Sequence, residues 1–151
     1  MKKILILLFL TTATTFVSCN KDDDNVPTPL PPTTAELIVG SWEFSQVGLL
    51  MGETEMLEPY DHQEPACGKD YIQFNSNNTG ADFYHYYDTE CGIDEETFTY
   101  TINGEVFSMV YSDGYTLNGT VMTVNSTTLK IKATVDEEGV TYTIIAVFNK
   151  K

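Results

Sequence analysis

Alternating apolar and polar residues recur from residue 69 to residue 148, and this pattern constrains the fold more than any other feature of the sequence. It is clearest where Leu129, Ile131 and Ala133 share one face of an extended segment. Lys130 and Lys132 then fall on the opposite face. A period of two residues is typical of a β-strand with one face buried and the other in water.

Eight strands are predicted from this pattern, over residues 40–46, 70–75, 81–88, 97–102, 106–111, 120–124, 128–135 and 140–148. Most are joined by short turns, of which Asn103-Gly104 is the strongest hairpin signal. Such links favour an up-and-down antiparallel sheet, and eight strands can close into a barrel without exposed edges. We therefore expect an all-β, eight-stranded up-and-down antiparallel barrel, with a β-sandwich as the alternative.

Other segments are expected to differ from the strands. Residues 35–39 favour one short helical turn, and the strand over 120–124 is expected to begin after Asn118-Gly119. Residues 51–68 and 89–96 are polar and are predicted as loops. The first of them is long for a connection without structure, which is typical of a lid or a binding loop.

The beginning of the chain has the features of a targeting segment. Lys2 and Lys3 precede an apolar run that is too short to span a bilayer as a helix. The run ends in Phe16-Val17-Ser18-Cys19, which resembles the lipobox of bacterial lipoproteins. This resemblance implies a signal peptide over 1–18 and a membrane anchor of lipid on Cys19. The alternative is an ordinary secreted protein with a cysteine near its cleavage site.

A tether is predicted over residues 19–34, before a domain over 35–151. Four prolines within it favour a stiff, extended segment. Lys21-Asp22-Asp23-Asp24 resembles the signal that sends lipoproteins of the Bacteroidota to the outer face of the outer membrane. We therefore expect a lipid-anchored, cell-surface protein, although a charge run of this kind is also typical of a plain solvated tether.

Charge excludes one class of partner. The 22 acidic residues all follow residue 18, whereas two of the eight lysines precede it, so the chain after the signal peptide has six lysines, no arginine and a formal charge of −16. Proteins that bind nucleic acid neutralise phosphates with Lys and Arg. Nucleic acid is therefore not an expected partner.

Two cysteines remain once Cys19 is assigned to the lipid. Cys67 and Cys91 favour a disulfide, because disulfides persist in exported proteins. A metal site formed with His62 or His85 is the alternative, although zinc sites usually have closely spaced Cys pairs.

The barrel interior is the candidate ligand site, because eight strands leave room for side chains or for one small ligand. His85, Tyr100 and Tyr142 would be its polar groups. A core filled by large aromatic side chains is the alternative. The residues predicted to point inward are Trp42, Phe44, Ile72, Phe74, Phe83, His85, Phe98, Tyr100, Leu129, Ile131, Tyr142 and Ile144.

No catalytic, cofactor or metal site is predicted. The sequence has no Gly-x-Ser-x-Gly elbow, no His-Glu-x-x-His motif and no phosphate-binding glycine loop. No spacing of acidic residues singles out the carboxylate pair that a glycosidase needs. We therefore do not expect an enzyme.

The order of motifs over residues 35–151 resembles the lipocalin-like domains of Bacteroidota lipoproteins. Gly40-Ser41-Trp42 is similar to the Gly-x-Trp start of lipocalins, and a Cys precedes a strand at 67–74. A Gly-containing turn at 78–80, Cys91 and the hairpin over 98–104 follow in the same order. Lipocalins usually pack an Arg across that Trp. This chain has none, so Lys130 or Lys132 would be a poor substitute without a planar group.

Two functions are compatible with these observations. The resemblance implies a barrel that binds a small, mostly apolar ligand. The alternative is an interaction module for a protein or glycan, with a filled barrel and with Tyr84 and Tyr86 exposed beside acidic loops.

Overall fold

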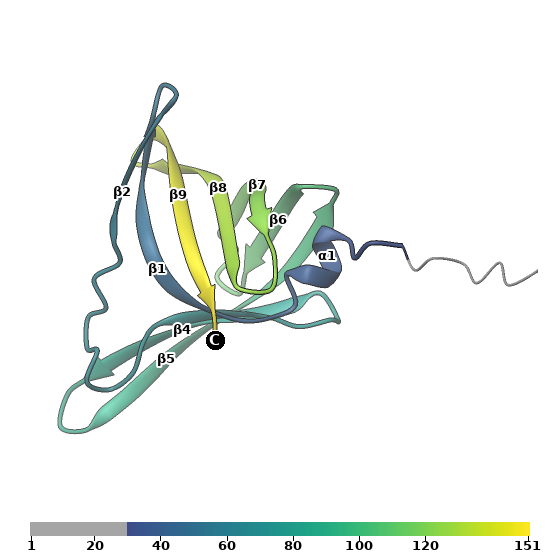
Figure 1. The fold of residues 1–151 in the computed structure, drawn as a ribbon. Helices are drawn as coiled ribbons and strands as arrows, with labels where there is room; N and C mark the ends of the chain where they lie inside the picture. The colour runs from purple at the N-terminus through teal and green to yellow at the C-terminus, as the bar shows by residue number, and fades with distance from the viewer. Residues whose placement is uncertain (1–29) are drawn as a thin grey trace, which may run out of the picture. The chain divides into compact units, whose positions relative to one another are not determined.

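A computed structural model describes residues 30–151, so the predictions for the signal peptide, for Cys19 and for most of the tether lie outside the described residues. The described part contains one helix and nine strands (Figure 1). They are α1 (Thr34–Leu37), β1 (Gly40–Met51), β2 (Thr54–Pro59), β3 (Tyr71–Phe74), β4 (Thr79–Tyr87), β5 (Cys91–Asn103), β6 (Val106–Tyr111), β7 (Thr116–Val124), β8 (Thr128–Glu137) and β9 (Val140–Lys150).

The strands form one closed antiparallel barrel. From β3 to β9 each strand pairs with the next in the sequence, and β9 returns to pair with β1. That pairing occupies one edge of β1. The other edge is shared, because β3 pairs with 40–43 and β2 with 46–51. Nine strands therefore fill eight positions in the wall, which confirms the predicted eight-stranded barrel and excludes the sandwich.

The prediction of a loop over residues 51–68 was wrong in part, because β2 lies within it. A two-residue turn that begins at Gly52, with φ of 63°, reverses the chain after β1. Glycine adopts this conformation without strain. Polar residues and Pro59 conceal β2 in the sequence, and both are typical of an edge strand. The segment that remains irregular is 60–70.

Two other boundaries differ from the prediction. Residues 91–96 are strand rather than loop, because they pair with β4 in a long hairpin (Figure 1). Asn118 and Gly119 lie inside β7 rather than before it. A Cβ at Gly119 would lie 2.2 Å from the Lys132 carbonyl oxygen, so this glycine serves close packing between strands and not a turn.

The end of the barrel next to α1 is closed by packed side chains. Trp42 is fully buried, and its indole Nε1–H donates to the Ile38 carbonyl at 2.6 Å. Lys150 Nζ lies 4.1 Å from the centre of the Trp42 ring and donates to the Val39 carbonyl. Lys150, and neither Lys130 nor Lys132, therefore takes the place of the missing Arg over the Trp. Lys130 pairs instead with Glu55.

Segment 60–70 fills the wall beyond the end of β3, where β4 has no strand partner on that side. Asp70 is almost fully buried, and its carboxylate accepts hydrogen bonds from Tyr60 Oη at 3.0 Å and from the His85 backbone N–H at 2.7 Å. The Cys67–Cys91 disulfide joins the segment to the start of β5. This confirms the disulfide prediction. Side chains and one covalent bond, together with single backbone hydrogen bonds from Tyr60 to Ser45 and from Phe44 to Asp70, thus hold this part of the wall in place of a backbone ladder.

Candidate functional site

The barrel contains an inner cavity of about 220 Å³. This is smaller than the roughly 300–1,000 Å³ of pockets for drug-sized ligands, so it suits a small molecule. Most of its lining is aliphatic or aromatic. The lining residues are Phe44, Ile72, Asp82, Tyr84, Met109, Tyr111, Tyr115, Leu117, Ile131, Val135, Ile144, Ala146 and Phe148.

The strand register places the cavity toward the end of the barrel opposite α1. On β9, Phe148 pairs with Leu129 near the closed end, whereas Ile144 pairs with Ala133 further along. Tyr115 lies immediately before β7 and is 42% exposed, although it lines the cavity. Its ring centre lies 5.9 Å from that of Tyr111, which lies deeper. The cavity therefore reaches the surface beside Tyr115.

Asp82 is the one acidic residue of the cavity lining, and it is 3% exposed. Its Oδ2 accepts a hydrogen bond of 2.7 Å from Tyr111 Oη, while its buried Oδ1 has no partner among the described residues. Burial raises the pKa of the Asp82 carboxyl to about 7, and the negative charge of Glu96 adds to this rise. The Tyr111 hydrogen bond acts in the opposite direction.

Phenol groups surround this carboxyl. Burial and the charge of Asp82 raise the pKa of both Tyr84 and Tyr111 well above the ordinary value, so both remain neutral hydrogen-bond donors at physiological pH. The Phe44 ring centre lies 6.4 Å from that of Tyr84 and 4.6 Å from that of Phe148. The site thus combines one carboxyl group with several aromatic rings inside an otherwise apolar cavity.

The residues predicted to point inward fall into three groups. Phe44, Ile72, Ile131 and Ile144 line the cavity. Five others are buried in the same core without lining it. They are Trp42, Phe74, Phe98, Tyr100 and Leu129.

Of the remaining three, Phe83 and His85 are corrections. Phe83 faces outward and stacks on Tyr71, with ring centres 4.5 Å apart. His85 lies on the same face as Phe83 and is covered by Gly68. Tyr142 pairs with the cavity residue Val135, so it lies on the inward face as predicted, near the start of β9, but it does not line the cavity and its hydroxyl donates to Glu137.

The prediction missed Asp82 and Tyr84 because it chose the wrong face of β4. Phe83 and His85 make one face of this strand look more apolar, and Asp82 makes the other look exposed. The barrel buries the face with the carboxylate. Tyr84, expected on the exterior, therefore lines the cavity. The position of Asp82 within a predicted strand of a small closed barrel could have indicated the site. Charged residues that break a local pattern concentrate at functional sites.

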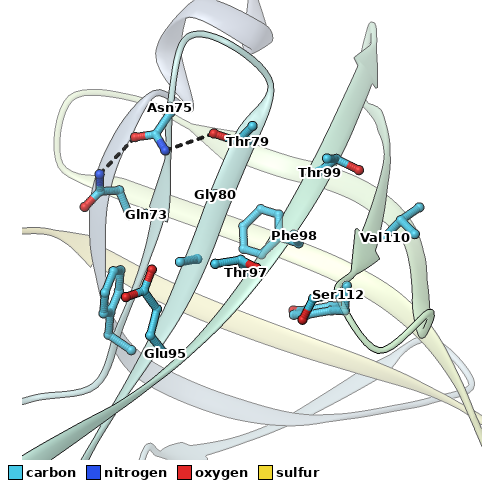
Figure 2. A pocket seen from close by; sticks show the side chains of 13 residues that line it. Gln73, Asn75, Thr79, Gly80, Glu95, Thr97, Phe98, Thr99, Val110 and Ser112 are labelled. Carbon is cyan, nitrogen blue, oxygen red and sulfur yellow. Dashed lines mark hydrogen bonds between the residues drawn. The ribbon is translucent and has the colours of Figure 1, made fainter.

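A second hollow lies on the outer surface, across β3 to β6, with a volume of about 640 Å³ (Figure 2). Its surface combines apolar side chains with several polar groups. The Asn75 amide links Gln73 to Thr79 through hydrogen bonds of 2.9 and 3.2 Å, and Thr97 and Thr99 contribute hydroxyl groups from β5 (Figure 2). We call this hollow the outer groove.

Other kinds of site receive no support within residues 30–151. No group of three or more His, Cys, Asp or Glu side chains there is arranged to hold a metal ion. His62 Nδ1 instead accepts a hydrogen bond from the Asp70 backbone N–H at 3.1 Å. No helix in this part of the chain has the length and apolar character that a transmembrane span requires.

Comparison with known proteins identifies the family. The sequence over residues 38–131 matches the family model of the lipocalin-like domain. A lipocalin-like protein from Bacteroides uniformis has a similar structure, with a TM-score of 0.52, 15% sequence identity, and coverage of 76% of this chain and 98% of the other. An uncharacterized protein from Bacteroides eggerthii is similar at a TM-score of 0.52 and 11% identity, covering 76% and 99%. No curated protein matches the sequence. The matched region spans more than half of the sequence, and the chain therefore belongs to the lipocalin-like domain family.

Proposed function

We propose that this protein is lipid-anchored at the cell surface and binds a small, mostly apolar molecule inside its barrel. The observation that carries the binding proposal is the cavity of about 220 Å³ with a predominantly apolar lining. The lipocalin fold commonly binds small hydrophobic ligands, and its family is typically non-enzymatic. We extend both properties to this chain.

The interior arrangement favours binding over a purely structural barrel. Protein cores are packed almost without voids larger than a water molecule. Large side chains fill the closed end around Trp42, whereas the other half of the same interior leaves a cavity that reaches the surface near Tyr115. A barrel that served only as a scaffold would gain stability from filling that space.

Native mass spectrometry of the chain, as exported and processed by its host, tests the binding proposal. We expect a discrete additional mass that is lost on denaturation. The protein mass without any adduct, together with failure of all small apolar probes to bind, would contradict the proposal.

The anchor is proposed from the sequence of residues 16–24. Lipid on Cys19 would supply the membrane affinity, at about 0.8 kcal/mol per buried methylene. The change Cys19→Ala is expected to move the protein from the membrane fraction to the soluble fraction, whereas Asn20→Ala should leave it membrane-bound. Protease treatment of intact cells would then report surface exposure. Full membrane partitioning of Cys19→Ala would contradict the lipid anchor.

A second candidate function rests on the exterior. The outer groove offers hydroxyl, amide and carboxylate groups, which suit a polar partner such as a glycan. Tyr86 and Tyr87 are 39% and 59% exposed on the β4–β5 hairpin. Binding of a glycan that is reduced by Thr97→Val and unaffected by changes in the cavity would favour this function.

A further inference from the structure

The carboxyl group inside the cavity is only half satisfied by the protein. Tyr111 donates to Asp82 Oδ2, and Oδ1 is buried without a partner among residues 30–151. Leaving a buried acceptor unpaired is costly, and more so for a charged group. Asp82 lines the cavity, so Oδ1 is positioned to accept a hydrogen bond from a molecule bound there.

Positive charge from the protein does not balance this carboxylate. Asp82 takes part in no ion pair within the described residues. The titratable groups whose charges or hydrogen bonds couple to it are acidic or phenolic, namely Tyr60, Tyr84, Glu96 and Tyr111. None of the five lysines in the described part lies at this carboxylate. Lys69 and Lys130 pair with Glu43 and Glu55, and Lys150 and Lys151 lie over the rings of Trp42 and Tyr71. Lys132 is next to the cavity residue Ile131 on β8 and therefore points to the opposite face of the strand.

Aromatic rings provide a second element of cation recognition. Phe44, Tyr84 and Tyr111 line the cavity together with Asp82. The face of an aromatic ring attracts a cation within about 6 Å of its centre, and the attraction strengthens when water is excluded. A carboxylate among rings therefore favours a cationic group over a neutral or anionic one.

We propose that the ligand of this barrel is a small lipophilic amine, whose ammonium group donates a hydrogen bond to Asp82 Oδ1 among the rings of Phe44, Tyr84 and Tyr111. The inference rests on the proposed binding function and specifies the chemistry of its ligand. A primary or secondary ammonium fits the site, because a quaternary one has no N–H to donate to Oδ1. The volume of about 220 Å³ limits the apolar part to roughly one ring and a short chain.

Calorimetric titration with a matched pair of probes tests this inference. The probes are 2-phenylethylamine and 2-phenylethanol, which share the same skeleton and differ in charge. At pH 8 we expect the amine to bind about ten- to a hundredfold more tightly than the alcohol, as for a charge-assisted hydrogen bond in a buried site. Asp82→Asn should remove this preference. Asp88→Asn, which removes the same charge from the exposed end of the β4–β5 hairpin, should retain it.

Failures of the two proposals are distinguishable. Binding of the alcohol at least as tightly as the amine, or an amine preference that survives Asp82→Asn, would overturn the amine inference and leave the binding function standing. Binding of neither probe, with no adduct in the native mass spectrum, would overturn the binding function itself and this inference with it.

The pH dependence of the wild-type protein provides a test that does not depend on the variant folding. The amine keeps its proton up to about pH 10. Asp82 must lose its proton to accept the ammonium, so the amine affinity should rise roughly tenfold per pH unit up to about pH 7 and then level off. The affinity of the alcohol should change much less. An amine affinity that is independent of pH between 5 and 8 would overturn the inference.

Discussion

Asp82 should make the stability of this barrel fall as pH rises through the neutral range, in contrast to an ordinary salt-bridged acid. In the unfolded chain its pKa has the ordinary value of 3.8, and burial raises the folded value to about 7. Below about pH 3.8 both states hold the proton and the stability contribution is complete. Between the two values the unfolded chain ionises first, so folding loses free energy, and above about pH 7 the loss is complete.

The magnitude follows from the separation of the two pKa values. A difference of about three units corresponds to roughly 4 kcal/mol, at 1.36 kcal/mol per unit. Most of this change lies between pH 4 and pH 8. It is a large share of the roughly 5–15 kcal/mol by which domains are stable. The Tyr111 hydrogen bond is already included, because it opposes the rise in pKa.

The substitution Asp82→Asn isolates this contribution, because the amide does not titrate and can still accept from Tyr111. Urea unfolding of ligand-free protein at pH 4 and pH 8 gives the free energy of unfolding of wild type and variant. We expect the variant to gain about 3–4 kcal/mol relative to wild type between these two pH values. Asp88→Asn should show no such gain. Parallel stability curves for wild type and Asp82→Asn would refute the assignment of a buried, proton-binding carboxyl in the cavity.

Two further substitutions test the parts of the fold that hold the cavity. Asp70→Ala is expected to lower the free energy of unfolding by about 2–4 kcal/mol, because it leaves buried hydrogen-bond donors unpaired. It should also increase proteolysis within 60–70. The control Asp88→Ala should have neither effect. Unchanged cleavage within 60–70 would show that the Asp70 carboxylate does not hold the segment. Lys150→Met is expected to cost about 0.5–1 kcal/mol and to change the fluorescence of Trp42, because the ammonium lies over the indole ring; an unchanged emission spectrum would argue against that contact.

The barrel could be predicted from the sequence because most of its strands repeat the same signal. Alternation over 128–135 and the hairpin signal at Asn103-Gly104 depend only on local chemistry, and both the strand and the hairpin are present. The turn itself is Gly104-Glu105, one residue later than the signal, because Asn103 pairs with Val106. β2 could not be recognised, because an edge strand with exposed residues has little apolar alternation. The interior of β7 around Gly119 was misplaced, because a glycine that lets two strands approach looks the same in sequence as a glycine in a turn.

The site was harder to predict than the wall that carries it. Alternation gives two faces of β4 but does not say which is buried, and the choice by hydrophobicity favoured Phe83 over Asp82. The structure buries Asp82 because β4 pairs with β3 and β5 in a register that directs Asp82 and Tyr84 to the interior. Choosing the more apolar face of a strand as the buried face gives the wrong answer where the fold buries a carboxylate, as it does at Asp82.

The pairing between β1 and β9 also determines the order of events while the barrel is being made. Trp42 on β1 pairs with Lys150 on β9, so the partners are separated by more than a hundred residues of chain. At the usual rate of synthesis of about 5–20 residues per second, β9 is made roughly 5–20 seconds after β1. Hairpins such as β5–β6 can form within this time, because their strands are adjacent in sequence. Closure of the barrel therefore requires the last strand of the chain, and the enclosed interior cannot exist before β9 has been made.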